Sequence, residues 1–147
     1  MPEVFPLVSA SSKPLWIAGG IACVLFGLAC FFGYLAYSAR HVQFEVHEDG
    51  LRINGDIYGR TIARTALNLE QARAVDLNQE RSLQPRLRTF GTGLPGYRAG
   101  WFKLRSGEKA LVFVTDYSRV VYIPTHEDYA LLLSVAEPAA FLNALRR

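Results

Sequence analysis

Few residues of this 147-residue chain have the types and spacing that catalysis or metal binding requires. Its three histidines, His41, His47 and His126, are far apart and form none of the H-E-x-x-H, H-x-E or H-x-x-x-H patterns. His126-Glu127-Asp128 groups possible bases, but such a short polar stretch between strands is typical of a solvated hairpin tip. We therefore predict no catalytic residue, no metal site and no cofactor.

A glycine-rich segment is the candidate for a phosphate-binding loop. Gly91, Gly93 and Gly96 match the pattern G-x-G-x-x-G. In a dinucleotide-binding turn this pattern opens a helix, whereas here it follows an arginine-rich stretch and precedes a predicted strand. We interpret the glycines as allowing a sharp bend of the backbone.

Basic residues collect between Arg81 and Gly107, where no Asp or Glu occurs. Near an anionic membrane each such residue contributes about 1 kcal/mol of attraction. The alternative is that they pair within the fold with Glu45, Glu70, Asp76 or Glu80. Nucleic-acid binding is disfavoured by a net charge of only +3 and by the apolar segment described next. The candidate residues for binding a membrane surface or a protein partner are Arg81, Arg86, Arg88 and Arg98.

A run of 25 residues from Leu15 to Ala39 contains no Asp, Glu, Lys or Arg. As a helix it would extend roughly 37 Å, enough to cross a hydrocarbon core about 30 Å thick. Trp16 near one end, with Tyr34 and Tyr37 near the other, suits the interfacial aromatic belts. A cleaved signal peptide is the alternative, but its apolar core is only about 7 to 15 residues long. We predict a transmembrane helix over 15–39, preceded by an N-terminal tail over 1–14.

The charges beside this run bear on its orientation. Lys13 precedes it, and Arg40 and Arg52 follow, so the positive-inside rule slightly favours a cytoplasmic C-terminal domain. Both cysteines lie inside the run, so the remainder offers neither a disulfide nor a thiolate metal site. Gly19, Cys23 and Gly27 place small residues at every fourth position, which lets a second helix approach closely. The helix is therefore either a lone anchor or part of a homo-oligomer.

After the run, apolar residues recur at every second position, which is typical of strands. Asp49-Gly50 is a strong turn signal inside residues 42–53, so we predict a hairpin there, followed by a strand-like segment over 56–63. We predict a turn of helix near 69–71 and a strand over 73–77. Pro and Gly between Asn78 and Gly96 indicate a long loop.

The C-terminal part shows the clearest pattern. Four apolar stretches, over 99–105, 110–115, 120–125 and 129–133, are separated by short polar turns and predict an antiparallel meander. Glu137-Pro138 is typical of the start of a helix. In that helix Phe141, Leu142 and Leu145 would form an apolar stripe on one side. We predict a mainly β domain of six or seven antiparallel strands, a partly open barrel capped by one C-terminal helix.

Several tracts resemble a family of bacterial pleckstrin-homology-like (PH-like) domains. They are Ile57-Tyr58-Gly59-Arg60, Gly91-Thr-Gly-Leu-Pro-Gly-Tyr97, Gly100-Trp-Phe-Lys-Leu-Arg105, Val120-Val-Tyr-Ile-Pro-Thr125 and the ending from Ser134 to Leu145. The resemblance implies a PH-like domain over 42–147 with two near-orthogonal sheets closed at one corner by the last helix. Similar family members often carry one or two transmembrane helices before the domain, and no enzymatic activity or ligand is attached to the group as a rule.

One turn departs from the phosphoinositide-binding relatives of this family. Those relatives carry Lys and Arg in the loop joining their first two strands, whereas the matching turn here is His47-Glu48-Asp49-Gly50. Acidic side chains repel phosphate groups, so inositol-phosphate recognition does not carry over to this chain.

Together these features predict a non-catalytic, membrane-anchored PH-like module that binds a protein partner or the anionic membrane surface. We expect a single pass through the bacterial inner membrane. The alternative is a small membrane-bound enzyme whose site is assembled from dispersed residues such as Asp116, His126 and Glu127. An enzyme requires a pocket in which such side chains converge, and a module requires an exposed apolar or basic surface.

Overall fold

The computed structural model describes residues 3, 5, 6, 8, 9, 11–55 and 57–147. They form two compact units, residues 1–40 and 41–147, which we describe separately. In the predicted N-terminal tail over 1–14, positions 1, 2, 4, 7 and 10 lie outside the described residues.

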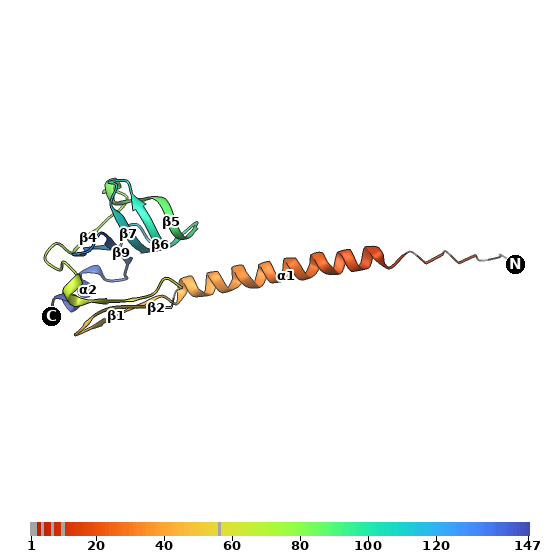
Figure 1. Ribbon diagram of the computed structural model, residues 1–147, viewed down its shortest axis with the longest axis horizontal. Coiled ribbons are helices and arrows are strands. Elements are labelled where there is room, and N and C mark those ends of the chain that lie inside the picture. Colours follow the sequence, from red (N-terminus) through yellow and green to blue (C-terminus); the bar gives the residue numbers. More distant parts are fainter. Residues whose placement is uncertain (1–2, 4, 7, 10, 56) are drawn as a thin grey trace. The chain divides into compact units, whose positions relative to one another are not determined.

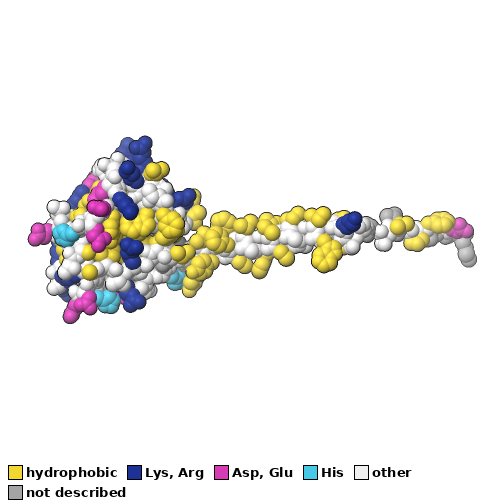
Figure 2. Space-filling model, in the orientation of Figure 1, with side chains coloured by type: hydrophobic (Ala, Val, Ile, Leu, Met, Phe, Trp, Pro, Cys, Tyr) yellow, Lys and Arg dark blue, Asp and Glu magenta, His cyan; other side chains and the backbone are white. Residues whose placement is uncertain are grey.

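The first unit contains one helix, α1, over Lys13–Arg40. Its mean hydropathy reaches 2.3 over the most apolar window, and none of that window is buried. Figure 2 shows hydrophobic side chains along most of its surface. The helix expected over 15–39 is therefore continuous, and its length and composition suit both a membrane span and a signal sequence.

The second unit begins with a three-stranded sheet in the order β1-β2-β3. Its strands are β1 over Gln43–His47, β2 over Gly50–Asn54 and β3 over Thr61–Ala63. The hairpin expected at Asp49-Gly50 forms, with His47 opposite Gly50. The segment expected as strand-like over 56–63 is paired only from Thr61 onward, and Asp56 lies outside the described residues.

A six-stranded sheet has the order β4-β8-β9-β7-β6-β5. Its strands are β4 over Arg73–Val75, β5 over Pro85–Leu94, β6 over Tyr97–Leu104, β7 over Lys109–Val114, β8 over Val120–Pro124 and β9 over Ala130–Ser134. The described residues thus form nine strands in two sheets (Figure 1), rather than six or seven strands in one partly open barrel, and no closed barrel is present among them.

The meander expected from β6 to β9 is wrong in one connection. β9 lies between β7 and β8 and runs parallel to β7. The Ser134 hydroxyl at the end of β9 accepts hydrogen bonds from the amides of Thr115 and Asp116, at 3.1 and 3.2 Å, which holds the β7–β8 turn beside β9. The apolar sequence of β9 also favours a central position in the sheet, where Leu131, Leu132 and Leu133 have no exposed area.

The loop expected between Asn78 and Gly96 is also wrong, since most of it is β5. β5 pairs with β6 over its whole length and has register shifts at Arg86 and Thr89. Two bulges of this kind bend an edge strand and oppose its pairing with a further strand. The predicted helical turn at 69–71 is absent, and short 3-10 helices lie instead at Arg64–Ala66 and Arg81–Leu83.

The C-terminal helix forms as expected, as α2 over Pro138–Arg146. Leu142 and Leu145 are buried, and the ring of Phe44 on β1 lies 6.3 Å from those of Phe141 on α2 and Phe113 on β7. These contacts place α2 and the three-stranded sheet on the same face of the six-stranded sheet.

Both faces of the six-stranded sheet are apolar at its centre. One face carries Leu111, Leu131 and Ile123, which are paired across β7, β9 and β8 and fully buried. The opposite face carries Val112 and Leu132 and is covered by Leu77 and Leu83 of the segment before β5. The sheet is therefore packed on both faces at its centre, and its edge strand β5 presents most of its side chains to solvent.

Candidate functional site

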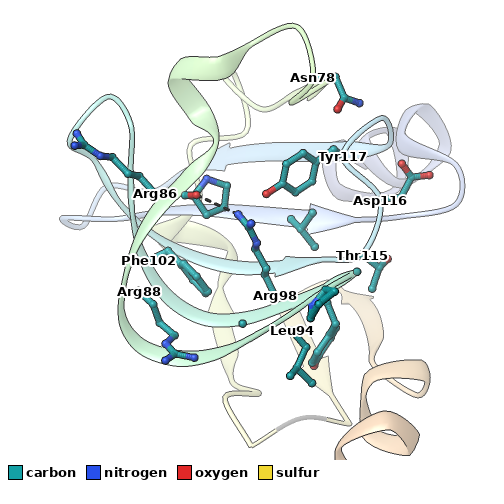
Figure 3. A pocket seen from close by; sticks show the side chains of 15 residues that line it. Asn78, Arg86, Arg88, Leu94, Arg98, Phe102, Thr115, Asp116 and Tyr117 are labelled. Carbon is teal, nitrogen blue, oxygen red and sulfur yellow. Dashed lines mark hydrogen bonds between the residues drawn. The ribbon is translucent and has the colours of Figure 1, made fainter.

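A groove of about 890 Å³ lies between the β5–β6 hairpin and the turn that follows β7. Arg86, Arg88 and Arg98 line it together with Asp116 and Tyr117, and we call it the arginine groove (Figure 3). It occupies the sheet face covered by Leu77 and Leu83. Cross-strand partners point to the same face, and the register pairs Arg98 with Val114 and Arg88 with Phe102 on that face.

Arg98 is the cation whose position is best defined in the arginine groove. Its side chain is half-buried, and Nη1 donates a hydrogen bond to the Pro85 carbonyl oxygen at 3.1 Å. The guanidinium carbon lies 5.4 Å from the centroid of the Tyr117 ring. Figure 3 shows Arg98 extending toward the side of the groove where Tyr117 lies, with its hydrogen bond drawn as a dashed line. A guanidinium has five N–H donors, so the bond to Pro85 leaves most of them for a ligand.

Arg86 and Arg88 line the rim of the groove and are exposed. In Figure 3 their guanidinium groups point away from the centre of the groove, on the side of β5. Arg86 lies at the first register shift of β5, where the strand carries an extra residue. Arg81, in the 3-10 helix before β5, does not line the groove. The structure therefore brings together three of the four predicted arginines.

The acidic residue of the groove already has partners. One carboxylate oxygen of Asp116 accepts hydrogen bonds from the Ser118 amide and hydroxyl, at 2.9 and 2.6 Å, and the other lies 3.8 Å from Arg119 Nε. These hydrogen bonds lower the pKa of Asp116. Among the described residues, no ion pair joins Asp116 or another carboxylate to Arg86, Arg88 or Arg98.

A second polar cluster contains Glu80, one of the carboxylates that could have paired with the basic residues, and here its partner is Arg73. Arg73 on β4 donates two hydrogen bonds to its carboxylate, the second at 2.7 Å. This bond lowers the pKa of Glu80 and raises that of Arg73. Beside it, the Tyr122 hydroxyl donates to the Glu108 carboxylate, at 3.0 and 3.1 Å from its two oxygens. Burial, and then this contact, raise the pKa of Tyr122 to about 12.

The residues of the alternative enzyme site do not converge. Asp116 lines the arginine groove, His126 lines a pocket with Glu48 and Asp49, and Glu127 lines another. Among the residues that the structure describes, no group of three or more His, Cys, Asp or Glu side chains has the arrangement of a metal site.

The sequence did not indicate Tyr117 as a site residue. Its turn, Asp116 to Arg119, was expected to be a simple connection between paired strands. The Tyr117 carbonyl instead accepts a hydrogen bond from the Leu77 amide at 2.8 Å, which fixes the turn against the segment before β5. An aromatic residue inside an otherwise polar turn was the available signal.

A protein-family model described as a bacterial PH domain matches residues 42–147. The matched region starts two residues after the end of α1 and contains both sheets and α2. No curated protein and no solved structure matches the chain.

Proposed function

The chain belongs to the bacterial PH domain family, and from this premise we propose that it is a membrane-anchored interaction module whose arginine groove binds an acidic segment of a partner protein. The family is typically non-catalytic, and we assign the chain no reaction. The observation that carries the proposal is Arg98, a half-buried cation with no carboxylate partner among the described residues.

The anchor in this proposal is α1. Its 28 residues correspond to roughly 42 Å at 1.5 Å per residue, which exceeds a hydrocarbon core of about 30 Å and allows some tilt. Trp16, Tyr34 and Tyr37 near its ends are exposed, as interfacial aromatic residues are. We place the helix in the bacterial inner membrane and, from Arg40 and Arg52 against Lys13, the domain in the cytoplasm.

The shape of the groove favours a protein segment over a flat membrane surface. Arg98 lies inside a concave site, and a bilayer surface reaches only groups that protrude from the domain. An extended chain can enter the groove and place a carboxylate against the guanidinium, which can donate two parallel hydrogen bonds to the carboxylate oxygens. Leu94 and Tyr117 line the same groove and offer contact to an apolar neighbour of the acidic residue.

The two outer arginines extend this charge complementarity. Arg86 and Arg88 on the rim attract a second or third acidic residue at longer range, which raises the association rate more than the affinity. Arg98 should therefore contribute most of the affinity for the acidic segment. Arg86 and Arg88 should contribute most of the dependence of that affinity on salt concentration.

The experiment is a selection of phage-displayed random peptides on the detergent-solubilised full chain. We expect enrichment of peptides with Asp or Glu beside an apolar residue. Affinity of a selected peptide, measured by fluorescence anisotropy, should fall about tenfold in Arg98→Lys, which keeps the charge but loses the planar fork.

The matched control is Arg105→Gln, because Arg105 is exposed near the opposite end of β6 and outside the groove lining. This variant should bind like the wild type. A selection without acidic preference, or an Arg98→Lys variant that binds as tightly as the wild type and melts at the same temperature, contradicts the proposal.

A further inference from the structure

Three large apolar side chains of the domain are exposed together at its β5 side. Ile57, Leu87 and Phe90 have exposed fractions of 71%, 59% and 68%. The Phe90 ring contacts the Tyr58 ring with centroids 5.6 Å apart, which brings the segment of Ile57 beside β5. In the part of the domain that the structure describes, these are the large apolar side chains found exposed.

The strand register puts Leu87 and Phe90 on the sheet face opposite the arginine groove. Leu87 lies opposite Lys103, and Phe90 lies opposite Trp101. The register shift at Thr89 causes this, because an extra residue between Arg88 and Phe90 turns Phe90 to the face that Leu87 shares. The edge strand therefore places Arg88 on the face of the groove, and Leu87 and Phe90 on the other face.

Two lysines accompany the apolar residues on this face. Lys103 on β6 pairs directly with Lys109 on β7, and both are exposed. Like charges directly opposite each other in a sheet are unfavourable, and an anion placed over both relieves the repulsion. The Lys109 ammonium lies 4.6 Å from the centroid of the Trp101 ring, so the apolar and cationic groups form one surface. We call Leu87, Phe90, Lys103 and Lys109, with Ile57 at the edge, the apolar-basic face.

Carboxylates do not neutralise these lysines within the described residues, because neither takes part in an ion pair there. Arg60 also stacks on Trp101, at 5.2 Å, but it shares a pocket with Glu127, so we do not count it among the unpaired charges. On the side of the molecule drawn in Figure 2, hydrophobic side chains of the domain lie next to Lys and Arg side chains.

We infer that the apolar-basic face docks on the anionic surface of the membrane that holds α1. Protruding apolar side chains flanked by lysines are the chemistry of interfacial membrane contact, in which the apolar groups enter the headgroup boundary and the cations meet lipid phosphates. Only His41 and Val42 separate α1 from β1, so the anchor keeps the domain at the bilayer surface. The inference rests on the anchor of the proposed function and not on the arginine groove.

This contact gives the module a defined orientation. The apolar-basic face turns to the lipid while the arginine groove, on the opposite face of the same two strands, stays open to a partner. Because the tether already supplies proximity, weak contact is enough to set the orientation.

The test uses the full chain with Trp16→Phe, which leaves Trp101 as its single tryptophan. The chain is reconstituted into nanodiscs of brominated phosphatidylcholine, with or without phosphatidylglycerol, and quenching of Trp101 fluorescence by the lipid bromines is measured. We expect quenching in the anionic discs, little in the zwitterionic discs, and a decrease at high salt.

Variants separate this contact from the proposed function. Leu87→Ser with Phe90→Ser, and separately Lys103→Gln, should abolish most of the quenching, whereas Arg52→Gln, an equal charge change on the other sheet, should leave it unchanged. Arg98→Lys should also leave it unchanged while weakening peptide binding. Equal quenching in both kinds of disc, or full quenching in the Leu87→Ser and Phe90→Ser variant, overturns the inference.

Discussion

A pair of glycines lies where strands β5 and β6 approach each other closely, and this contact allows a quantitative prediction. Gly100 on β6 lies opposite Gly91 on β5 and has φ = +112°. A Cβ added at Gly100 would lie 2.6 Å from both the Gly91 Cα and the Phe90 carbonyl oxygen. Ordinary contacts between carbon atoms are about 3.5 to 4.0 Å, so the two strands must move apart by about 1 Å. Both obstructing atoms are backbone, so no side-chain rotation relieves the clash.

Gly100→Ala therefore carries two costs. Overpacking of this kind costs about 1 to 3 kcal/mol, and an alanine at positive φ costs a further 1 to 2 kcal/mol or so. We expect the free energy of unfolding to fall by about 2 to 5 kcal/mol. In a domain of this size that lowers the melting temperature by about 10 °C or more.

Gly93→Ala is the matched control on the same hairpin. The nearest atom to its added Cβ is the mobile Arg88 Nη1 at 3.7 Å, and Gly93 is not at positive φ. This variant should stay within about 0.5 kcal/mol of the wild type. Urea melts followed by near-ultraviolet circular dichroism measure both variants. The reasoning fails if Gly100→Ala is as stable as the wild type, or if Gly93→Ala is destabilised equally.

Three further predictions concern the helices and one tyrosine. Leu145→Ala should destabilise the domain by about 2 to 4 kcal/mol, because Leu145 is only 2% exposed, while the exposed Asn143→Ala should change little; thermal melts decide this. Folding raises the pKa of Tyr122 from 10.0 to about 12, so the protonated hydroxyl stabilises the folded state. This contribution to the free energy of unfolding is complete below pH 10 and is lost as the pH rises toward 12. The wild type should therefore lose stability across that interval more steeply than Tyr122→Phe, as seen in urea midpoints measured at each pH. Carbonate washing of membranes should leave the full chain in the pellet because of α1, and its release into the supernatant would refute the membrane anchor.

The elements that the sequence predicted well have strong local signals. A long run without charges makes α1 helical, Asp49-Gly50 closes the first hairpin, and the spacing of Leu142 and Leu145 defines the buried side of α2. The PH-like resemblance is confirmed over residues 42–147. In each case the residues that determine the structure lie within a few turns or positions of each other.

The elements that were missed depend on distant partners. Pro and Gly made residues 78–96 resemble a loop, but Gly91 and Gly100 fit against each other only when β5 and β6 pair. That pairing decides which side chains of β5 share a face. The sequence therefore indicates Arg86, Arg88 and Arg98 as binding candidates, but it does not show that Leu87 and Phe90 lie on the opposite face. Arg81 was grouped with them because charge along the sequence carries no information about which face of the fold a residue occupies.

The position of β9 has a consequence for how the domain folds. It is the last strand along the sequence, yet it lies at the middle of the sheet and runs parallel to β7, which ends at Val114, 16 residues before β9 begins at Ala130. Until Ala130 to Ser134 have been synthesised, β7 and β8 each expose an unpaired apolar edge, and non-local parallel pairing of this type is slow. The sheet can therefore be completed only after β9 has been synthesised, and a nascent chain stopped before residue 130 should be prone to aggregation and dependent on chaperones.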